Sequence, residues 1–223
     1  EAEASYNRAI ALKPEFAEAY SNLGATLKEL GRLSEAEASY NQAILLNSDY
    51  AEAHNNLGAT LQELERLDEA ETAFTQAIAL KPDYAEAHYN LGITLQQLGK
   101  LDDAEASYEQ AIALKPDYAE AHNNLGVTLQ ELGRLDDAEA SYQQVIALKF
   151  DSVESHNNLG NVLKELGRLD KAEASYQQAI ALMPDYAEAH NNLGITLQQL
   201  GRLDDAEASY QQVIALKFDS VES

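Results

Sequence analysis

The sequence predicts an all-α fold, an α-solenoid built from antiparallel helix pairs. The first observation is a repeat: the string Ala-Glu-Ala-His-Asn-Asn-Leu-Gly begins at Ala51, Ala119 and Ala187, and a close variant begins at Ala85, so the period is 34 residues. The second is that each period contains two apolar stripes with the spacing of amphipathic helices. A fixed period of this size is typical of solenoids, in which each repeat covers the apolar face of its neighbour.

Six full repeats account for most of the chain. We number them 1 to 6, and they cover residues 17–50, 51–84, 85–118, 119–152, 153–186 and 187–220. Residues 1–16 match the second half of a repeat, so we expect the second helix of a truncated repeat there. Residues 221–223 match the start of a further repeat. A single solenoid is therefore expected over residues 1–223, rather than a set of separate cores.

Repeat 3 illustrates why both halves of a repeat should be helical. Apolar residues recur at spacings of three and four in each half, first as Ala87, Leu91, Leu95 and Leu98, then as Leu101, Ala104, Tyr108, Ala111, Ile112 and Leu114. Gly99 separates the two halves and suits the left-handed turn that ends a helix. In repeat 2, Glu65 takes the place of this glycine, which should cost a modest amount of stability at that turn.

Capping boxes are expected where the helices begin. In such a box a Ser or Asp side chain and a Glu three residues later satisfy backbone N–H groups at the helix start. For the second helices the pairs are Ser34/Glu37, Asp68/Glu71, Asp102/Glu105, Asp136/Glu139, Asp170/Glu173 and Asp204/Glu207. For the first helices they are Asp83/Glu86, Asp117/Glu120 and Asp185/Glu188, each preceded by a proline that stops the previous helix.

The net charge of the chain limits the classes of partner that it can attract. The formal net charge of −23 argues against nucleic acids and against anionic membranes, because both attract Lys and Arg. A cationic partner would be attracted, although the acidic residues can also serve only to keep a long apolar array soluble. No apolar run reaches the roughly 18 residues of a membrane span. Cysteine is absent, which leaves the compartment open, and the cytoplasm is our expectation.

The residues that could carry chemistry give no support for an enzyme, a cofactor or a metal. No nucleophile–base pair and no Gly-rich phosphate loop is found in the sequence. Five histidines hold the fourth position of successive repeats: His54, His88, His122, His156 and His190. Packed helices lie about 8–10 Å apart, too far for two such rings to share a zinc ion at roughly 2 Å. Tyr20 holds the same position in repeat 1, so we expect these rings to pack.

The repeat resembles the tetratricopeptide repeat, and the resemblance covers the whole chain. In that family a small set of positions carries the packing, and in repeat 3 they hold Leu91, Gly92, Leu95, Ala104, Tyr108, Ala111 and Pro116. The resemblance implies that Gly92 and Ala104 allow close helix contact and that Tyr108 fills the space between helices. It also implies a right-handed superhelix whose first helices line a concave face.

A polar stripe follows the first helices. Asn holds the sixth position of every full repeat: Asn22, Asn56, Asn90, Asn124, Asn158 and Asn192. On a helix this position shares a face with positions 2, 5, 9, 12 and 13, which in repeat 3 are Glu86, Tyr89, Ile93, Gln96 and Gln97. Such a stripe has too little apolar surface for a core, so it should face the concave groove.

An amide both donates and accepts hydrogen bonds, so a ladder of amides can pair with the backbone of any extended peptide. We therefore predict a peptide-binding site at the sixth-position asparagines. The fifth position adds Asn55, Tyr89, Asn123, Asn157 and Asn191, and the twelfth adds Gln62, Gln96, Gln130 and Gln198. The alternative is that these amides brace neighbouring helices.

Two branches of the family differ at this stripe. The asparagine ladder resembles that of O-linked N-acetylglucosamine transferases, which implies that the six ladder positions hold a polypeptide; a transferase domain is not in this sequence. The co-chaperone clamp, which grips a terminal carboxylate, needs Lys or Arg at positions where this chain has none. Lys28 and Lys164 lie on the stripe but in repeats that are not neighbours. The clamp is therefore rejected.

These observations favour a non-catalytic scaffold that binds an extended, polar or basic peptide or protein segment. Two alternatives stay open. One is a substrate-docking part of a larger enzyme such as a glycosyltransferase. The other is a structural, self-assembling or engineered array, because residues 123–155 and 191–223 differ at only two positions, Val127/Ile195 and Glu131/Gln199. Uncapped ends would also allow head-to-tail association of chains.

Overall fold

The computed structural model describes residues 1–148 and 152–219, and these residues form thirteen α-helices and no strand. In the first of two compact units, Glu1–Pro116, the helices are α1 (Ala2–Leu12), α2 (Ala17–Glu29), α3 (Leu33–Leu46), α4 (Ala51–Glu63), α5 (Leu67–Leu80), α6 (Ala85–Gln97) and α7 (Leu101–Leu114). In the second, Asp117–Ser223, they are α8 (Ala119–Glu131), α9 (Leu135–Ala147), α10 (Val153–Glu165), α11 (Leu169–Leu182), α12 (Ala187–Gln199) and α13 (Leu203–Asp219). The predicted start of a further repeat, residues 221–223, lies outside the described residues.

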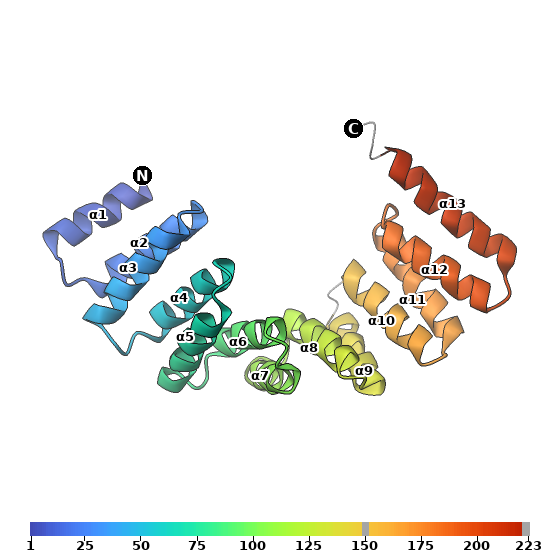
Figure 1. The fold of residues 1–223 in the computed structure, drawn as a ribbon, viewed down its shortest axis with the longest axis horizontal. Helices are drawn as coiled ribbons and strands as arrows, with labels where there is room; N and C mark the ends of the chain where they lie inside the picture. Colours follow the sequence, from blue (N-terminus) through green and yellow to red (C-terminus); the bar gives the residue numbers. More distant parts are fainter. Residues whose placement is uncertain (149–151, 220–223) are drawn as a thin grey trace. The chain divides into compact units, whose positions relative to one another are not determined.

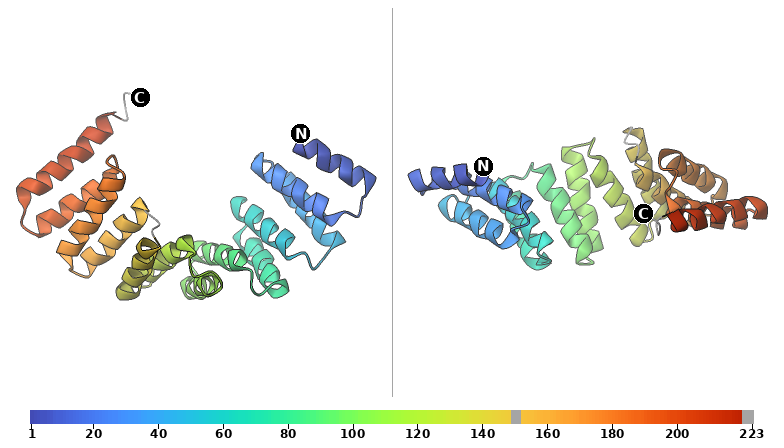
Figure 2. Two further views of the ribbon diagram at one scale, coloured as in Figure 1. Left: turned by 180° about the vertical axis from the view of Figure 1, so that it is seen from behind. Right: turned by 90° about the horizontal axis from the view of Figure 1, so that it is seen from above.

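Each compact unit is a stack of helix hairpins (Figures 1 and 2). Within a unit, every first helix packs against the second helix of its own repeat, and α2, α4, α6, α10 and α12 also pack against the second helix that precedes them. Successive first helices also touch, as α2 does α4 and α10 does α12. The first helices begin at the residues where the sequence predicts the repeats to begin: Ala17, Ala51, Ala85, Ala119, Val153 and Ala187. The prediction of an all-α repeat solenoid is confirmed.

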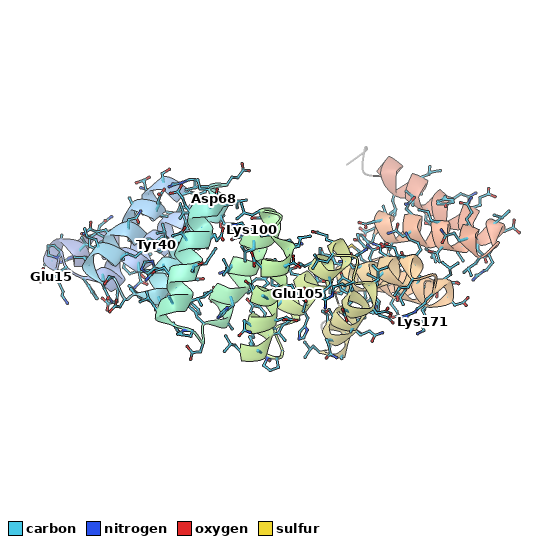
Figure 3. The ribbon with its side chains drawn as sticks, turned by 60° about the horizontal axis from the view of Figure 1, so that its bottom comes forward. Glu15, Tyr40, Asp68, Lys100, Glu105 and Lys171 are labelled. Atoms are coloured by element: carbon cyan, nitrogen blue, oxygen red, sulfur yellow. The ribbon has the colours of Figure 1, made fainter. Side chains whose placement is uncertain are left out.

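A glycine sets how closely the two helices of a repeat approach. A Cβ atom on Gly92 would lie 2.6 Å from the Tyr108 ring, and one on Gly24 would lie 2.8 Å from the Tyr40 ring. Both rings are buried, and Figure 3 shows Tyr40 among the helices of its unit. The same contact recurs in every full repeat, at Gly24, Gly58, Gly92, Gly126, Gly160 and Gly194. Any side chain there would push the aromatic ring out of the core.

The turn between the two helices of a repeat is a Schellman motif. In repeat 1 the N–H of Gly31 donates to Lys28 O at 2.9 Å and the N–H of Arg32 donates to Leu27 O at 2.9 Å, while Gly31 has φ of 72°. Repeat 2 builds the same motif with Glu65, whose φ is 59°. The left-handed region is unfavourable for a residue with a Cβ, so the strain expected at Glu65 has a backbone cause.

The predicted capping boxes are wrong. Among helices α1 to α12, only α10 is capped by a side chain, that of Ser152, which accepts from Ser155 N at 3.1 Å. The second helices begin one residue before the expected Ser or Asp, with Arg or Lys as N-cap. The reason is that the Schellman motif ends on the residue that opens the next helix, as Arg32 does, so no position remains for a separate cap. The first helices other than α10 are preceded by Phe or Tyr, and the predicted Asp caps lie outside the helices.

The glutamates of the predicted boxes instead bind the next repeat. Arg66 Nη1 lies 2.8 Å from Glu37, 29 residues earlier, and Arg66 Nη2 lies 2.6 Å from Glu69. Lys100 Nζ repeats the first of these contacts with Glu71 at 2.7 Å, and this contact raises the pKa of Lys100. Figure 3 labels Lys100 near Asp68, whose charge acts in the same direction. An ionic clasp thus joins successive second helices, as it also does for Arg32/Glu3, Arg168/Glu139 and Arg202/Glu173.

The hydroxyls of the buried tyrosines differ between repeats. Tyr108 Oη donates to Gln96 Oε1 at 3.1 Å and Tyr176 Oη donates to Asn161 Oδ1 at 2.8 Å. Tyr142 Oη is buried without a hydrogen-bond partner among the described residues. In repeat 4 the equivalent amide, Gln130, donates to Glu165 at 2.7 Å instead. Repeat 2 carries Phe74 at this position, so a hydroxyl is dispensable for the packing.

We predict that Glu65→Gly stabilises the protein by about 1 kcal/mol, because it removes left-handed strain from a residue with a Cβ. Urea unfolding followed by circular dichroism measures the change. Gly99→Ala is the matched control, since a Cβ there meets nothing within 4 Å and only the backbone conformation changes. It should destabilise by a similar amount, and an unchanged midpoint for both variants would contradict the assignment of strain.

We predict that Tyr142→Phe is neutral or stabilising, whereas Tyr176→Phe costs about 1 kcal/mol. The first change removes an unsatisfied buried hydroxyl, and the second removes a hydrogen bond and leaves Asn161 without that partner. Thermal unfolding of the two variants compares them directly. Equal losses of stability in both would show that the Tyr142 hydroxyl is satisfied in solution.

Candidate functional site

The candidate site is the stripe formed by positions 2, 5, 6, 9, 12 and 13 of the first helices, which we call the first-helix stripe. Its members lie on α2, α4 and α6 in one unit and on α8, α10 and α12 in the other. The sixth-position asparagines are exposed at Asn22 and partly exposed at Asn56, Asn90, Asn124, Asn158 and Asn192. The ladder side chains therefore reach the surface, and neighbouring helices place them next to one another.

Two fifth-position amides are buried. Asn55 and Asn157 are each 1% exposed, which corrects the expectation that they lie on an accessible surface. Asn55 Oδ1 accepts from Asn90 Nδ2 at 3.1 Å, and Asn157 Oδ1 accepts from Asn192 Nδ2 at 3.2 Å. The physical reason is that the fifth position points at the first helix of the next repeat. These two amides brace successive helices and are covered by them.

The side chains of Asn56 and Asn158 make no such amide bridge within the described residues. Asn123 Oδ1 accepts from the Ser155 hydroxyl at 2.9 Å, and Ser155 stands where the other full repeats have Ala. Asn158 makes no bridge like that of Asn192 within the described residues. Before Asn56 the fifth position is Ser21, which is buried. Within the described parts of the chain, no side-chain hydrogen bond engages Asn22, Asn56, Asn158 or the exposed Asn191.

The twelfth-position side chains form a second row of bridges. Lys28 Nζ lies 3.0 Å from Glu63, and Gln62 Nε2 donates to Gln97 Oε1 at 3.2 Å. Each pair joins one first helix to the next, as Gln130 and Glu165 do. Gln96 and Gln198 accept from the tyrosine of their own repeat, Tyr108 and Tyr210. The predicted glutamines thus lie on the stripe but already have partners within the protein.

The remaining predicted residue, Tyr89, is partly exposed and packs against the core. Its ring centroid lies 6.0 Å from that of Tyr108, at an interplanar angle of 51°. It is the one aromatic side chain at the fifth position of the six repeats. This placement makes it a part of the helix packing as well as of the stripe.

Exposed carboxylates border the amides; the sequence pattern placed this position on the stripe but did not make it a candidate contact. The second position of every full repeat is glutamate, and all six are exposed: Glu18, Glu52, Glu86, Glu120, Glu154 and Glu188. Burial, together with Glu86 and Glu52, raises the pKa of Tyr84 to about 12. Burial, Glu188 and Glu154 do the same for Tyr186, to about 12. The carboxylates of neighbouring repeats therefore act on one shared tyrosine, and the period of 34 could have revealed them.

The histidines hold loops rather than line this stripe. The Nε2 atoms of His54, His88 and His190 lie 3.1, 3.0 and 2.9 Å from the carbonyl oxygens of Ser48, Pro82 and Pro184. Each ring ties its helix to the loop that precedes it. In the described residues, no group of three or more His, Asp or Glu side chains is placed to hold a metal ion. No described helix has the length and apolar character needed to cross a membrane.

Comparison with known proteins places this geometry in context. A family model described as Tetratricopeptide repeat matches residues 15–83, 49–117 and 151–217, and a second model of that description matches residues 89–151. No curated protein matches the chain.

Several solved structures are similar. YrrB, described as a TPR protein with an unusual peptide-binding site, has a TM-score of 0.73 and 27% identity, over 85% of this chain and 97% of that one. Pseudomonas aeruginosa pilF has a TM-score of 0.76 and 17% identity, over 93% and 97% of the two chains. MamA has a TM-score of 0.73 and 23% identity, over 75% and 98%. The last two likenesses concern the fold alone.

We predict that Asn157→Ala destabilises the protein by about 1–3 kcal/mol, because it empties a buried position and removes the hydrogen bonds that this amide makes to Asn192 and Glu188. Asn158→Ala, one residue further along, should change stability by no more than about 0.5 kcal/mol. Thermal unfolding by circular dichroism compares the two. If both variants melted at the same temperature, the division into bracing and accessible amides would be wrong.

Proposed function

The chain belongs to the tetratricopeptide repeat family, and from that premise we propose that it is a non-catalytic scaffold that binds an extended peptide segment along its first-helix stripe. The observation that carries the proposal is that some ladder amides make no side-chain hydrogen bond within the described residues. Asn56 and Asn158 are partly exposed, and their hydrogen-bonding groups are not used by neighbouring helices. Such groups are suited to pair with the N–H and C=O of another chain.

The bracing amides support this proposal indirectly. Asn55 and Asn157 fix the positions of Asn90 and Asn192 through inter-helix hydrogen bonds. A ligand would therefore meet side chains whose orientation is already set, which lowers the entropy lost on binding. The accessible amides supply hydrogen bonds, and the bracing amides hold the spacing between helices.

The carboxylates favour a basic ligand. All six second-position glutamates are exposed, and the net charge of the chain is −23. The cations on the stripe are Lys28, which is paired with Glu63, and Lys164. A segment with Lys or Arg would be attracted over longer distances and would complement this edge, whereas an acidic segment would be repelled. The similarity to YrrB, described as having a peptide-binding site, supports a peptide as the ligand class.

We expect a twelve-residue peptide of Ser, Thr and Asn with three lysines to bind more tightly than its counterpart with three glutamates. Isothermal titration calorimetry at low salt measures both affinities. The preference should shrink as salt is raised, because exposed charges are screened. Absence of binding by either peptide would refute the proposed function.

The double variant Asn22→Ala/Asn56→Ala, which changes two ladder amides of one compact unit, should weaken binding of the lysine peptide by about thirtyfold, since each lost hydrogen bond contributes about 1 kcal/mol. Its melting temperature should stay close to that of the wild type. The matched control is Gln110→Ala/Gln178→Ala, which removes two exposed amides from second helices. Equal affinity of both double variants would exclude the ladder as the contact surface.

A further inference from the structure

Repeat 2 holds one of its own lysines at the edge of the stripe. Lys81 Nζ lies 3.1 Å from Glu52 Oε1 and 4.6 Å from the centre of the Tyr84 ring. Glu86, on the next first helix, is close enough to raise the pKa of Tyr84. One carboxylate and an aromatic face therefore hold this ammonium group, and a second carboxylate lies near the same ring; the arrangement stabilises a cation by charge and by cation–π attraction.

The aromatic residue that precedes a first helix also contacts a lysine ammonium group at another place in the same unit. Lys13 Nζ lies 4.9 Å from the centre of the Phe16 ring, and these two residues precede Ala17 as Lys81 and Tyr84 precede Ala85. The spacing of three residues between the lysine and the ring thus places the amine over the aromatic face in both cases. This geometry follows from the backbone at the end of the second helix.

Repeat 5 has the same surroundings without the lysine. Residues 81–88 read Lys-Pro-Asp-Tyr-Ala-Glu-Ala-His, and residues 183–190 read Met-Pro-Asp-Tyr-Ala-Glu-Ala-His. The backbone is the same, with φ −139° and ψ 84° at Lys81 and φ −136° and ψ 92° at Met183. Glu154 corresponds to Glu52, and Tyr186 and Glu188 correspond to Tyr84 and Glu86. The only change in this segment is the loss of the internal cation.

The groups that surround the missing amine remain in place. Tyr186 Oη donates to Glu188 Oε2 at 3.2 Å, and Asn157 Nδ2 donates to Glu188 Oε1 at 2.9 Å. Glu154 is exposed, and no hydrogen bond or ion pair of its side chain is found within residues 1–148 and 152–219. Met183 is 42% exposed and offers no charge. Repeat 5 therefore keeps two carboxylates and an aromatic ring positioned for a cation that its own chain does not supply.

The position of this cluster connects it to the ladder. Asn157, which holds Glu188, also accepts from the ladder residue Asn192. A peptide backbone that paired with the accessible amide of Asn158 would lie on the same helix as Glu154. Its side chains would then reach the carboxylates within the length of one lysine or arginine.

We propose that Glu154, Tyr186 and Glu188 form a subsite for a lysine or arginine side chain of the bound peptide, which Lys81 fills internally in repeat 2. This inference rests on the proposed function, because the cation arrives on an extended ligand. The inference assigns a basic side chain of the ligand to repeat 5, whereas Lys81 occupies the equivalent place in repeat 2.

The experiment exchanges the two residues that distinguish the repeats. The probe is a fluorescein-labelled twelve-residue peptide of Ser, Thr and Asn with one central lysine, and its partner carries norleucine at that place. Fluorescence anisotropy at low salt should show that wild type prefers the lysine peptide by about threefold to tenfold, the range expected for a partly exposed ion pair with cation–π contact. M183K should remove the preference, because it supplies the cation internally. M183L, which adds no charge, should keep it.

Two further variants test the same subsite from other directions. E154Q should reduce the preference, and K81M should increase it by opening the equivalent site in repeat 2. Circular dichroism confirms that each variant is folded. Retention of the lysine preference in M183K, or its loss in M183L, would overturn the subsite. Equal binding of the two peptides by wild type would also overturn it and leave the scaffold function intact, whereas absence of binding by both would overturn the scaffold function with it.

Discussion

The close contact between a glycine and an aromatic ring is the constraint on which the rest of the structure depends. Where Gly92 meets Tyr108, there is no room for even a methyl group, so the distance between the two helices of a repeat is fixed by the ring itself. Because every full repeat uses the same contact, every repeat has the same thickness. The first helices then recur at a constant interval within each unit. Regular spacing of Asn and Glu on the surface is a direct result of this packing in the core.

The positions of the helices and of the turns between them could be predicted from the sequence, because they depend on local patterns. Apolar spacing located each helix, and the glycine at the turn marked the Schellman motif that Gly31 forms. The helix caps were predicted wrongly because the pattern Ser/Asp-x-x-Glu was interpreted within one helix. Glu37 instead pairs with Arg66, 29 residues later, and only tertiary packing brings those two together. An Arg or Lys recurs at the start of each second helix, and this recurrence was the signal that the local interpretation missed.

The sequence predicted which residues share the first-helix stripe, but not which of them are exposed. Exposure depends on the side chains that the neighbouring helix places against each position. Asn157 is buried and accepts from Asn192, whereas Asn123 accepts from the Ser155 hydroxyl and Asn158 makes no such bridge within the described residues. These differences come from contacts between neighbouring helices, which the residue at each repeat position does not reveal by itself. The carboxylates at the second position were present in the sequence, but their action on Tyr84 and Tyr186 appears only when adjacent repeats are packed.

The ionic clasp has a consequence for how such a protein can lengthen. Every repeat carries one half of the clasp at its basic helix start and the other half at a glutamate five residues further on, as Arg66 and Glu71 do in repeat 2. A gene duplication that copies a whole repeat thus copies a complementary pair, and the new copy finds a partner on each side. The near-identity of residues 123–155 and 191–223 is what such growth would leave behind. The ion pairs between successive second helices are therefore compatible with the addition of whole repeats, and this does not depend on what the protein binds.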